Sequence, residues 1–335
     1  MKAAVFRCVG SPLEVVNLND PEPLENEVVL RVGRCGICGS DLHMTEPGSI
    51  NPKPGQVIGH EISGEVVALG KGVSRLKIGD RVAALPIKGC GRCAPCLAGE
   101  FSWCVEGVQI LLGGYAQYAR AGANECLVLP SNLSMADGSL VEPLAVALHG
   151  VRMAQGLPGS TVRVLGGGPI GLGAIFWARR FGARRVEAVE GNPVRADMAR
   201  TLGADEVFPP DAEANAGRPV APPDFVIECV GRPGLLDAAV AQVRSRGTVI
   251  SLGFCMTQEP FAAHLAARRE VTIKFPLRYT LDDYALTIET LASGAVEPRA
   301  MVTDVFNLDA LPARFEALRE PGRQCKVMID PWLEG

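Results

Sequence analysis

Residues 161–172 read "TVRVLGGGPIGL", and this stretch decides how the second half of the chain folds. A β-branched strand pattern runs into three consecutive glycines, and an apolar segment with helical spacing follows. The glycines match the pattern G-x-G-x-x-G, which lets backbone N–H groups approach a pyrophosphate at a helix N-terminus. The stretch therefore predicts a dinucleotide site that uses Gly166, Gly168, Pro169, Ile170 and Gly171. The other interpretation is a turn that only packs a helix on a sheet.

An acidic residue stands where such a glycine pattern is expected to have one. Glu190 ends the next predicted strand, 19 residues beyond Gly171, close to the spacing of about 20 residues typical of dinucleotide-binding units. We expect its carboxylate to accept hydrogen bonds from the adenosine ribose hydroxyls and to repel a 2′-phosphate. This favours NAD over NADP as the cofactor.

The rest of the chain divides by pattern. Strand and helix patterns alternate from about residue 150 to residue 278, which is typical of a doubly wound α/β fold with a parallel sheet. Before residue 140 the chain shows short alternating or apolar runs interrupted by Gly, Pro and Asp, which predicts a mostly β region. We therefore predict two domains, residues 144–278 and residues 1–143 together with 279–335, with "QCKVMI" as an isolated closing strand.

Four cysteines lie within fifteen residues, in "GCGRCAPCLAGEFSWC" at 89–104. Their spacing, C-x2-C-x2-C-x7-C, allows four thiolates on a short lobe to surround one Zn²⁺. With four protein ligands the site would be closed and structural. Buried free thiols and an iron–sulfur cluster are the alternatives, the latter with a less suitable spacing. The predicted ligands are Cys90, Cys93, Cys96 and Cys104.

A second group of possible ligands is spread over three segments: "GICGSDLH" at 36–43, "GHEISGEVV" at 59–67 and "LVEPLAVALHG" at 140–150. A thiolate, an imidazole and a carboxylate would form a zinc site with an open position for water or substrate. Each residue also has a plainer interpretation, such as a hydrogen-bonded core histidine or an acid that a helix N-terminus favours. The candidates are Cys38, His60, Glu61 and Glu142.

Composition excludes several classes of protein. The chain has 335 residues, of which 21% are charged, and a net charge of −4, so nothing predicts binding to nucleic acid or to an anionic membrane. No signal peptide or membrane helix is expected. Eleven cysteines, an odd number with four clustered, favour metal binding in a reducing compartment over a disulfide framework. We expect a cytoplasmic protein.

These motifs, with "IGDRV", "GADEVF", "DFVIECVG", "GTVISLGF" and the closing "KVMI", resemble those of the zinc-dependent medium-chain alcohol and polyol dehydrogenases over essentially the whole chain. The "EPL" at 142–144 is similar to the sorbitol and threonine dehydrogenase branch. The resemblance implies a GroES-like mostly-β catalytic domain beside a Rossmann domain. It also implies one catalytic and one structural zinc, an NAD cofactor, and a homodimer or homotetramer.

The resemblance also implies roles for the metal-site residues. Cys38 and His60 would hold the catalytic zinc, with Glu61 as a ligand or a close carboxylate. Glu142 would ligate zinc or hold its water, and Asp41 would orient His60. An oxygen-rich set suits vicinal oxygens, which favours a polyol, an amino alcohol or a hydroxyl-bearing ring. A proton relay would run from the substrate hydroxyl through Ser40 and the nicotinamide ribose to His43.

On the cofactor side, the resemblance places an arginine near the adenine and three residues at strand ends under the nicotinamide; these are Arg195, Val230, Gly231 and Gly253. Lys326 either touches the pyrophosphate or is an ordinary surface lysine. The expected activity is hydride transfer between NAD and a small-molecule secondary alcohol or polyol. The alternatives are a zinc-free quinone-reductase-like enzyme on the same fold and a non-catalytic NAD-binding protein.

Overall fold

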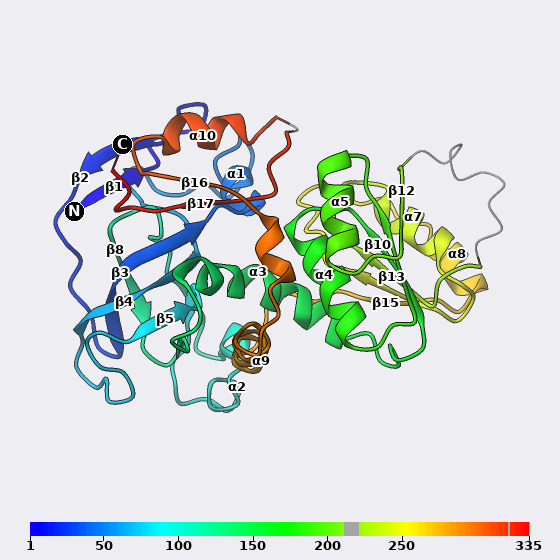
Figure 1. Cartoon of the computed structure of the whole chain (residues 1–335), viewed down its shortest axis with the longest axis horizontal. Helices are drawn as coiled ribbons and strands as arrows, with labels where there is room; N and C mark the ends of the chain where they lie inside the picture. Colours follow the sequence, from blue (N-terminus) through cyan, green and yellow to red (C-terminus); the bar gives the residue numbers. More distant parts are fainter. Residues whose placement is uncertain (211–220, 321, 335) are drawn as a thin grey trace. The chain divides into compact units, whose positions relative to one another are not determined.

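The glycine-rich segment forms the strand, turn and helix that its sequence predicts. In the computed structural model (Figure 1), which describes residues 1–210, 221–320 and 322–334, β10 covers Thr161–Leu165 and α4 covers Pro169–Arg180. Pro169 takes the first helical position, where its missing N–H leaves no unpaired donor. The tight turn between the two elements is therefore encoded locally.

The chain divides into two compact units. The first comprises Met1–Glu142, Thr280–Ala295 and Val302–Gly335, and the second Pro143–Tyr279 and Val296–Met301. These units differ from the predicted domains at Pro143, at Tyr279 and at 296–301, all of which we expected in the first. The difference at 296–301 is the largest. The reason is that the 3-10 helix η2 (Glu297–Met301) packs against α4 and α5 (Pro193–Thr201) of the second unit.

The second unit is built on a sheet in which every described strand pair is parallel. Its order along the sheet is β12-β11-β10-β13-β14-β15. Numbered along the chain this is 3-2-1-4-5-6, the doubly wound order, and the glycine turn follows the strand at which the order reverses. The other strands are β11 (Arg185–Val189), β12 (Glu206–Phe208), β13 (Phe225–Glu228), β14 (Thr248–Ser251) and β15 (Thr272–Lys274).

Helices cover both faces of this sheet. Figure 1 shows α4 and α5 on one side, and α7 (Leu235–Gln242) with α8 (Ala263–Arg268) on the other. Right-handed crossovers that run outward in opposite directions from a central strand place their helices on opposite faces. The predicted α/β class of this half is confirmed.

The first unit is mostly β, as predicted. Its main sheet has the order β16-β17-β3-β4-β5-β9, and β8 pairs with β3. The closing strand β17 is not isolated, because it pairs with β16 in parallel and with β3 in antiparallel orientation. The strands are β3 (Glu27–Gly36), β4 (Glu61–Leu69), β5 (Arg81–Ala84), β8 (Tyr118–Gly122), β9 (Cys126–Val128), β16 (Val302–Phe306) and β17 (Lys326–Ile329).

Short elements complete this unit. Two small pairs are β1 (Lys2–Val5) with β2 (Glu14–Asn17) and β6 (Ile87–Lys88) with β7 (Gln109–Ile110). The helical elements are α1 (Gly39–His43), α2 (Ala94–Leu97), η1 (Phe101–Trp103), α9 (Leu281–Ala292) and α10 (Leu311–Ala317), while α3 (Met135–Arg152) spans the boundary between the units. Within the described ranges, no helix is long and apolar enough to cross a membrane.

One buried ion network ties the centre of the parallel sheet together. Glu187 on β11 is fully buried and lies opposite Arg163 of β10 in the strand register. Arg163 Nη2 lies 2.7 Å from one carboxylate oxygen, and Arg185 Nε donates to the other over 2.8 Å. Because the Arg163 side chain is only 14% exposed, loss of its partner would leave a largely buried charge unpaired.

We expect Glu187→Ala to lower the free energy of unfolding of the second unit by about 3–5 kcal/mol, the range for removing one member of a buried ion pair. Urea unfolding followed by circular dichroism measures the effect. The matched control is Asp197→Ala on α5, whose side chain is 80% exposed and pairs with Arg200. Surface substitutions of this kind change stability by less than about 0.5 kcal/mol. Equal effects of the two substitutions would refute the assignment.

Candidate active site and zinc sites

Three predicted ligands meet in the first unit. The donor atoms of Cys38, His60 and Glu61 all lie within 4.8 Å of one another. A tetrahedral zinc with bonds of about 2.0–2.3 Å separates its ligand atoms by about 3.3–3.8 Å, so small side-chain movements suffice to bind one. Thiolate, imidazole and carboxylate are the donors that catalytic zinc takes in proteins, and three of them leave a position open. The residues therefore fit the metal.

The sheet brings these ligands together. Cys38 follows β3 and precedes α1, whereas Glu61 is the first residue of β4 and directly follows His60. Strands β3 and β4 are antiparallel, with Gly36 opposite Glu61. The end of one strand therefore lies beside the start of the next, although Cys38 is more than twenty residues from His60 and Glu61 in sequence.

Asp41 connects the parts of this site. Its carboxylate is fully buried and accepts the backbone N–H of Cys38 (3.0 Å) and the hydroxyl of Tyr115 (2.7 Å) on Oδ2. Its Oδ1 lies 3.0 Å from His60 Nδ1, which is the hydrogen bond expected from the sequence. This bond leaves Nε2 of His60 as the nitrogen for a metal. Tyr115 was not among the predicted residues, because nothing in "GGYAQ" marks it as a partner of a distant aspartate.

The pair of His60 and Asp41 is strongly polarised. Burial alone would lower the pKa of His60, but the charge and hydrogen bond of Asp41 outweigh it and raise that pKa well above its usual value. Burial likewise opposes ionisation of Asp41, yet His60 and the bonds to Cys38 and Tyr115 lower the pKa of its carboxyl. A metal bound at His60 must displace a proton that Asp41 stabilises.

Lys326 lies in this site, which the sequence did not predict. Its side chain is 2% exposed, and its Nζ donates to Glu61 Oε1 (2.6 Å) and Oε2 (2.8 Å). It also donates to the carbonyl of Ile37 at 3.1 Å. Neither predicted interpretation, a pyrophosphate contact or a surface lysine, describes this buried ion pair. The misassignment arose because its partner is 265 positions away along the chain.

Glu142 occupies the predicted place in sequence but is not part of the close group. It lies in α3 directly before Pro143, and 8% of its surface is exposed. Its charge, with those of Glu61 and Cys38, helps to raise the pKa of Lys326 despite the opposing effect of burial. It is therefore near enough to act on the site electrostatically, while its role as a direct ligand stays a prediction.

The predicted relay residues lie on the short helix α1. Ser40 and His43 are both exposed. The ring nitrogen Nδ1 of His43 is 3.2 Å from Glu46 Oε2, and both of these side chains are open to solvent. A proton that reaches His43 therefore has a carboxylate and water beside it. The relay itself stays a prediction.

The four clustered cysteines form a compact thiol group. Their sulfur atoms all lie within 4.8 Å of one another, and the sulfur atoms of Cys90 and Cys96, and of Cys93 and Cys104, are 3.9 Å apart. A tetrahedral zinc with Zn–S bonds of about 2.3 Å needs sulfur atoms about 3.8 Å apart. Backbone N–H groups of Cys96 and Val105 lower the pKa of Cys93 to about 6, which favours a thiolate. The lobe fits a structural zinc.

The glycine turn of the second unit has the geometry that a dinucleotide requires. Gly166 has a φ of 95°, a left-handed conformation that favours glycine. A Cβ on Gly171 would lie 1.8 Å from the carbonyl oxygen of Gly166, so only glycine permits this approach of helix to strand. Gly168 caps α4, and a Cβ there would meet no atom within 4 Å, so the described residues leave space beside the N-terminus of this helix.

Glu190, the predicted acceptor for the ribose hydroxyls, is hydrogen-bonded to the glycine turn. Its Oε2 accepts the N–H of Gly167 at 2.8 Å, and its Oε1 accepts that of Asn192 at 2.7 Å. Arg195 contacts both oxygens at 3.2 Å. Burial opposes ionisation, but these donors lower the pKa of Glu190. The guanidinium also neutralises part of the charge, which weakens the predicted repulsion of a 2′-phosphate.

The strand ends predicted to lie under the nicotinamide are packed against each other. A Cβ on Gly253 would lie 2.2 Å from the backbone nitrogen of Gly231. The buried carboxylate of Glu228 accepts the N–H groups of Val230 (2.6 Å) and Gly231 (2.9 Å). Sequence reasoning missed Glu228, although an acid at the last position of a buried strand was a usable signal.

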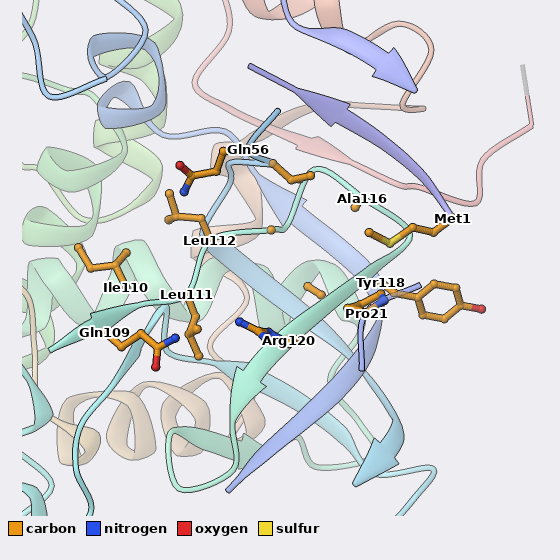
Figure 2. Close-up of a pocket in the computed structure, with 13 residues that line it drawn as sticks. Met1, Pro21, Gln56, Gln109, Ile110, Leu111, Leu112, Ala116, Tyr118 and Arg120 are labelled. Atoms are coloured by element: carbon orange, nitrogen blue, oxygen red, sulfur yellow. The ribbon is translucent and has the colours of Figure 1, made fainter. Parts of the chain in front are cut away.

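A separate hollow of about 290 Å³ lies elsewhere in the first unit (Figure 2). Its walls include the apolar side chains of Ile110, Leu111 and Leu112, with Gln56 and Arg120 as polar groups. Arg120 lies 3.5 Å from the buried Glu27 carboxylate. Of the described residues that line this hollow, none belongs to the predicted zinc or cofactor sites, so it is distinct from the chemistry described above.

Comparison with known proteins identifies two matching family models. Residues 24–131 match the "Alcohol dehydrogenase GroES-like domain", and residues 169–293 match the "Zinc-binding dehydrogenase" model. Among curated proteins, "Probable D-xylulose reductase A" from Aspergillus terreus is 34% identical over 94% of this chain and 92% of its own. The sorbitol dehydrogenase of Bacillus subtilis is 33% identical over 99% and 97%, respectively.

Solved structures agree with these matches. A zinc-binding dehydrogenase from Sinorhizobium meliloti 1021, bound to NADP, superposes with a TM-score of 0.88 at 29% identity and covers 98% of this chain and 99% of its own. The similarity therefore extends over both units of the chain.

The two cysteines of the segment "CGICG" at 35–39, Cys35 and Cys38, give a direct test of the ligand assignment. Cys35 is fully buried, and burial together with the charges of Asp41 and Glu61 raises the pKa of its thiol. We expect Cys35→Ser to keep two zinc ions per chain and Cys38→Ser to keep only one, as measured by elemental analysis. The reverse result would contradict the assignment of Cys38 as the ligand.

Proposed function

We propose that this chain, which belongs to the zinc-dependent medium-chain alcohol/polyol dehydrogenases, oxidises the secondary hydroxyl of a polyol or amino alcohol with NAD and reduces the corresponding ketone. The observation that carries the proposal is the close group of Cys38, His60 and Glu61, with the carboxylate of Glu142 nearby. An oxygen-rich ligand set of this kind suits a substrate with neighbouring hydroxyls. The similarity to a sorbitol dehydrogenase and to a D-xylulose reductase supports the same substrate class.

The bound groups supply two kinds of chemistry: zinc lowers the pKa of a coordinated hydroxyl, and the nicotinamide exchanges a hydride. The protein supplies ligands, orientation and a path for the proton. Asp41 holds His60 so that Nε2 faces the metal, and it fixes the loop of Cys38 through its backbone N–H. Because both contacts use one buried carboxylate, the two ligands keep a constant relation to each other.

For the proton, we propose a path from Ser40 to His43. Ser40 is two residues beyond the Cys38 ligand, and both relay residues are exposed positions of α1. The carboxylate of Glu46 beside His43 stabilises the imidazolium that results when the proton arrives. From there the proton passes to solvent.

For the cofactor, we propose a preference for NAD. The carboxylate of Glu190 lies beside the glycine turn, where it can accept hydrogen bonds from a ribose. The ion pair with Arg195 limits this preference, since a 2′-phosphate would find a guanidinium at the same place. We therefore expect NAD to be favoured without strict exclusion of NADP.

For assembly, we propose a homodimer or homotetramer. Strand β15 is an edge of the parallel sheet, and Phe275 and Leu277 directly after it are 66% and 53% exposed. An exposed edge with apolar neighbours is a surface that proteins usually cover. A second copy of the chain that pairs along β15 would cover it.

The test of the proposed function is an assay of NAD⁺ reduction, read by NADH absorbance, with five- and six-carbon polyols, amino alcohols, vicinal diols and simple alcohols. We expect turnover with polyols or amino alcohols, and its loss when the metal of the Cys38 site is removed by a chelator. Ser40→Ala should keep both zinc ions and lower kcat at least about 100-fold, the lower range for general acid–base catalysis. NADH formation that continues after this metal is removed would favour the zinc-free quinone-reductase-like enzyme. The absence of turnover with every alcohol tested would favour a non-catalytic NAD-binding protein.

Cofactor preference gives an independent prediction. Glu190→Ala removes ribose acceptors and frees Arg195, so we expect the ratio of kcat/KM for NAD to that for NADP to fall about 10–100-fold, equivalent to the 1.5–3 kcal/mol of a hydrogen bond to a charged group. Asp197→Ala, on the same helix as Arg195 but highly exposed, serves as the control. An unchanged ratio in Glu190→Ala would remove this residue from cofactor recognition.

A further inference from the structure

A lysine ammonium is buried inside the proposed catalytic zinc site. Lys326 donates to both oxygens of Glu61 and to the carbonyl of Ile37, so all three of its protons have acceptors. The Lys326 side chain is 2% exposed to solvent, and the Glu61 side chain is 0% exposed. A buried cation beside a metal-binding group opposes the metal electrostatically, so its presence needs a reason.

The sheet is shaped to make this contact. Strand β3 lies between β17, which carries Lys326, and β4, which begins with Glu61. Gly36 of β3 pairs with Glu61 on one side and with Met328 on the other. A Cβ on Gly36 would lie only 1.8 Å from Glu61 Oε2. The missing side chain opens the space through which lysine and glutamate meet across the strand.

The charges of the site explain what the lysine does. With a metal bound, the thiolate of Cys38 and the carboxylates of Glu61 and Glu142 would be the anionic groups near Lys326. A divalent metal with these three and neutral His60 has one negative charge in excess, which one ammonium balances. Without the lysine, Glu61 would have the metal as its strongest remaining partner. With it, each carboxylate oxygen already accepts one short hydrogen bond and is a weaker donor to a metal.

We propose that Lys326 is a positioning residue of the catalytic metal site: by holding both oxygens of Glu61, it limits that ligand to a single bond to the metal and so keeps a coordination position open for the substrate oxygen. The inference rests on the proposed metal site and is independent of the identity of the alcohol. It assigns a function to Gly36 as well, because any larger residue there would separate the pair.

The test uses the full chain with Co²⁺ in place of catalytic zinc, and imidazole as a probe of the open position. Cobalt bound to thiolate absorbs visible light, and the absorption weakens when a fourth ligand is joined by a fifth. We expect Lys326→Met to have the weaker spectrum of a higher-coordinate ion and at least tenfold lower affinity for imidazole. Lys326→Arg, which keeps the charge and donors, should remain nearer to wild type. A Lys326→Met protein with the spectrum and imidazole affinity of wild type would overturn the proposal.

A second comparison covers the case in which Lys326→Met does not fold because Glu61 is left buried and unpaired. Replacing both members of a buried pair by neutral residues is often tolerated, so Glu61→Gln/Lys326→Met is compared with Glu61→Gln alone. If the lysine acts through Glu61, the two proteins bind imidazole with equal affinity within about twofold. A tenfold difference between them would refute that route. Failure of wild type to bind Co²⁺ at Cys38 would instead refute the metal site itself.

Discussion

The position of strand β3 between β4 and β17 is the constraint on which the metal site depends. Its pairing with β4 places Gly36 opposite Glu61, and its pairing with β17 brings the C-terminal strand to the same place. Cys38 and Asp41 follow β3, His60 and Glu61 lie at the start of β4, and Lys326 is the first residue of β17. A shift of register by one residue would turn Glu61 to the other face of the sheet and separate it from Cys38 and His60.

Charge compensation is the second theme of the site. The fully buried Asp41 is stable because His60, Tyr115 and a backbone N–H contact it, and the buried Glu61 because Lys326 does. Each carboxylate therefore holds another functional group in place while its own charge is satisfied. Buried charges without such partners would be unstable, so the arrangement couples the integrity of the first unit to the geometry of its ligands.

In the second unit, carboxylates likewise hold neighbouring groups in place near the cofactor turn. Glu190 directly follows β11 and accepts the N–H of Asn192 and, from the glycine turn, that of Gly167. Glu228 ends β13 and accepts the N–H groups of Val230 and Gly231, which follow it. These loops carry the glycines that a dinucleotide backbone would approach. The carboxylates thus stiffen the turns, and Glu190 retains its charge because Asn192, Arg195 and Gly167 all donate to it.

The sequence by itself determined the two fold classes, the cysteine lobe and the glycine turn, because those features depend on spacing and periodicity within short segments. The candidate ligands of the catalytic metal site came instead from the resemblance of their motifs to those of a known family. It also indicated that Asp41 partners His60, because the ligand motifs share a known pattern. Tyr115, Glu228 and the true place of Lys326 escaped, as did the assignment of 296–301 to the second unit. Only the tertiary structure decided these, because a buried charge chooses its partner by distance in space, and the register of three strands brings Lys326 and Glu61 together from opposite ends of the chain.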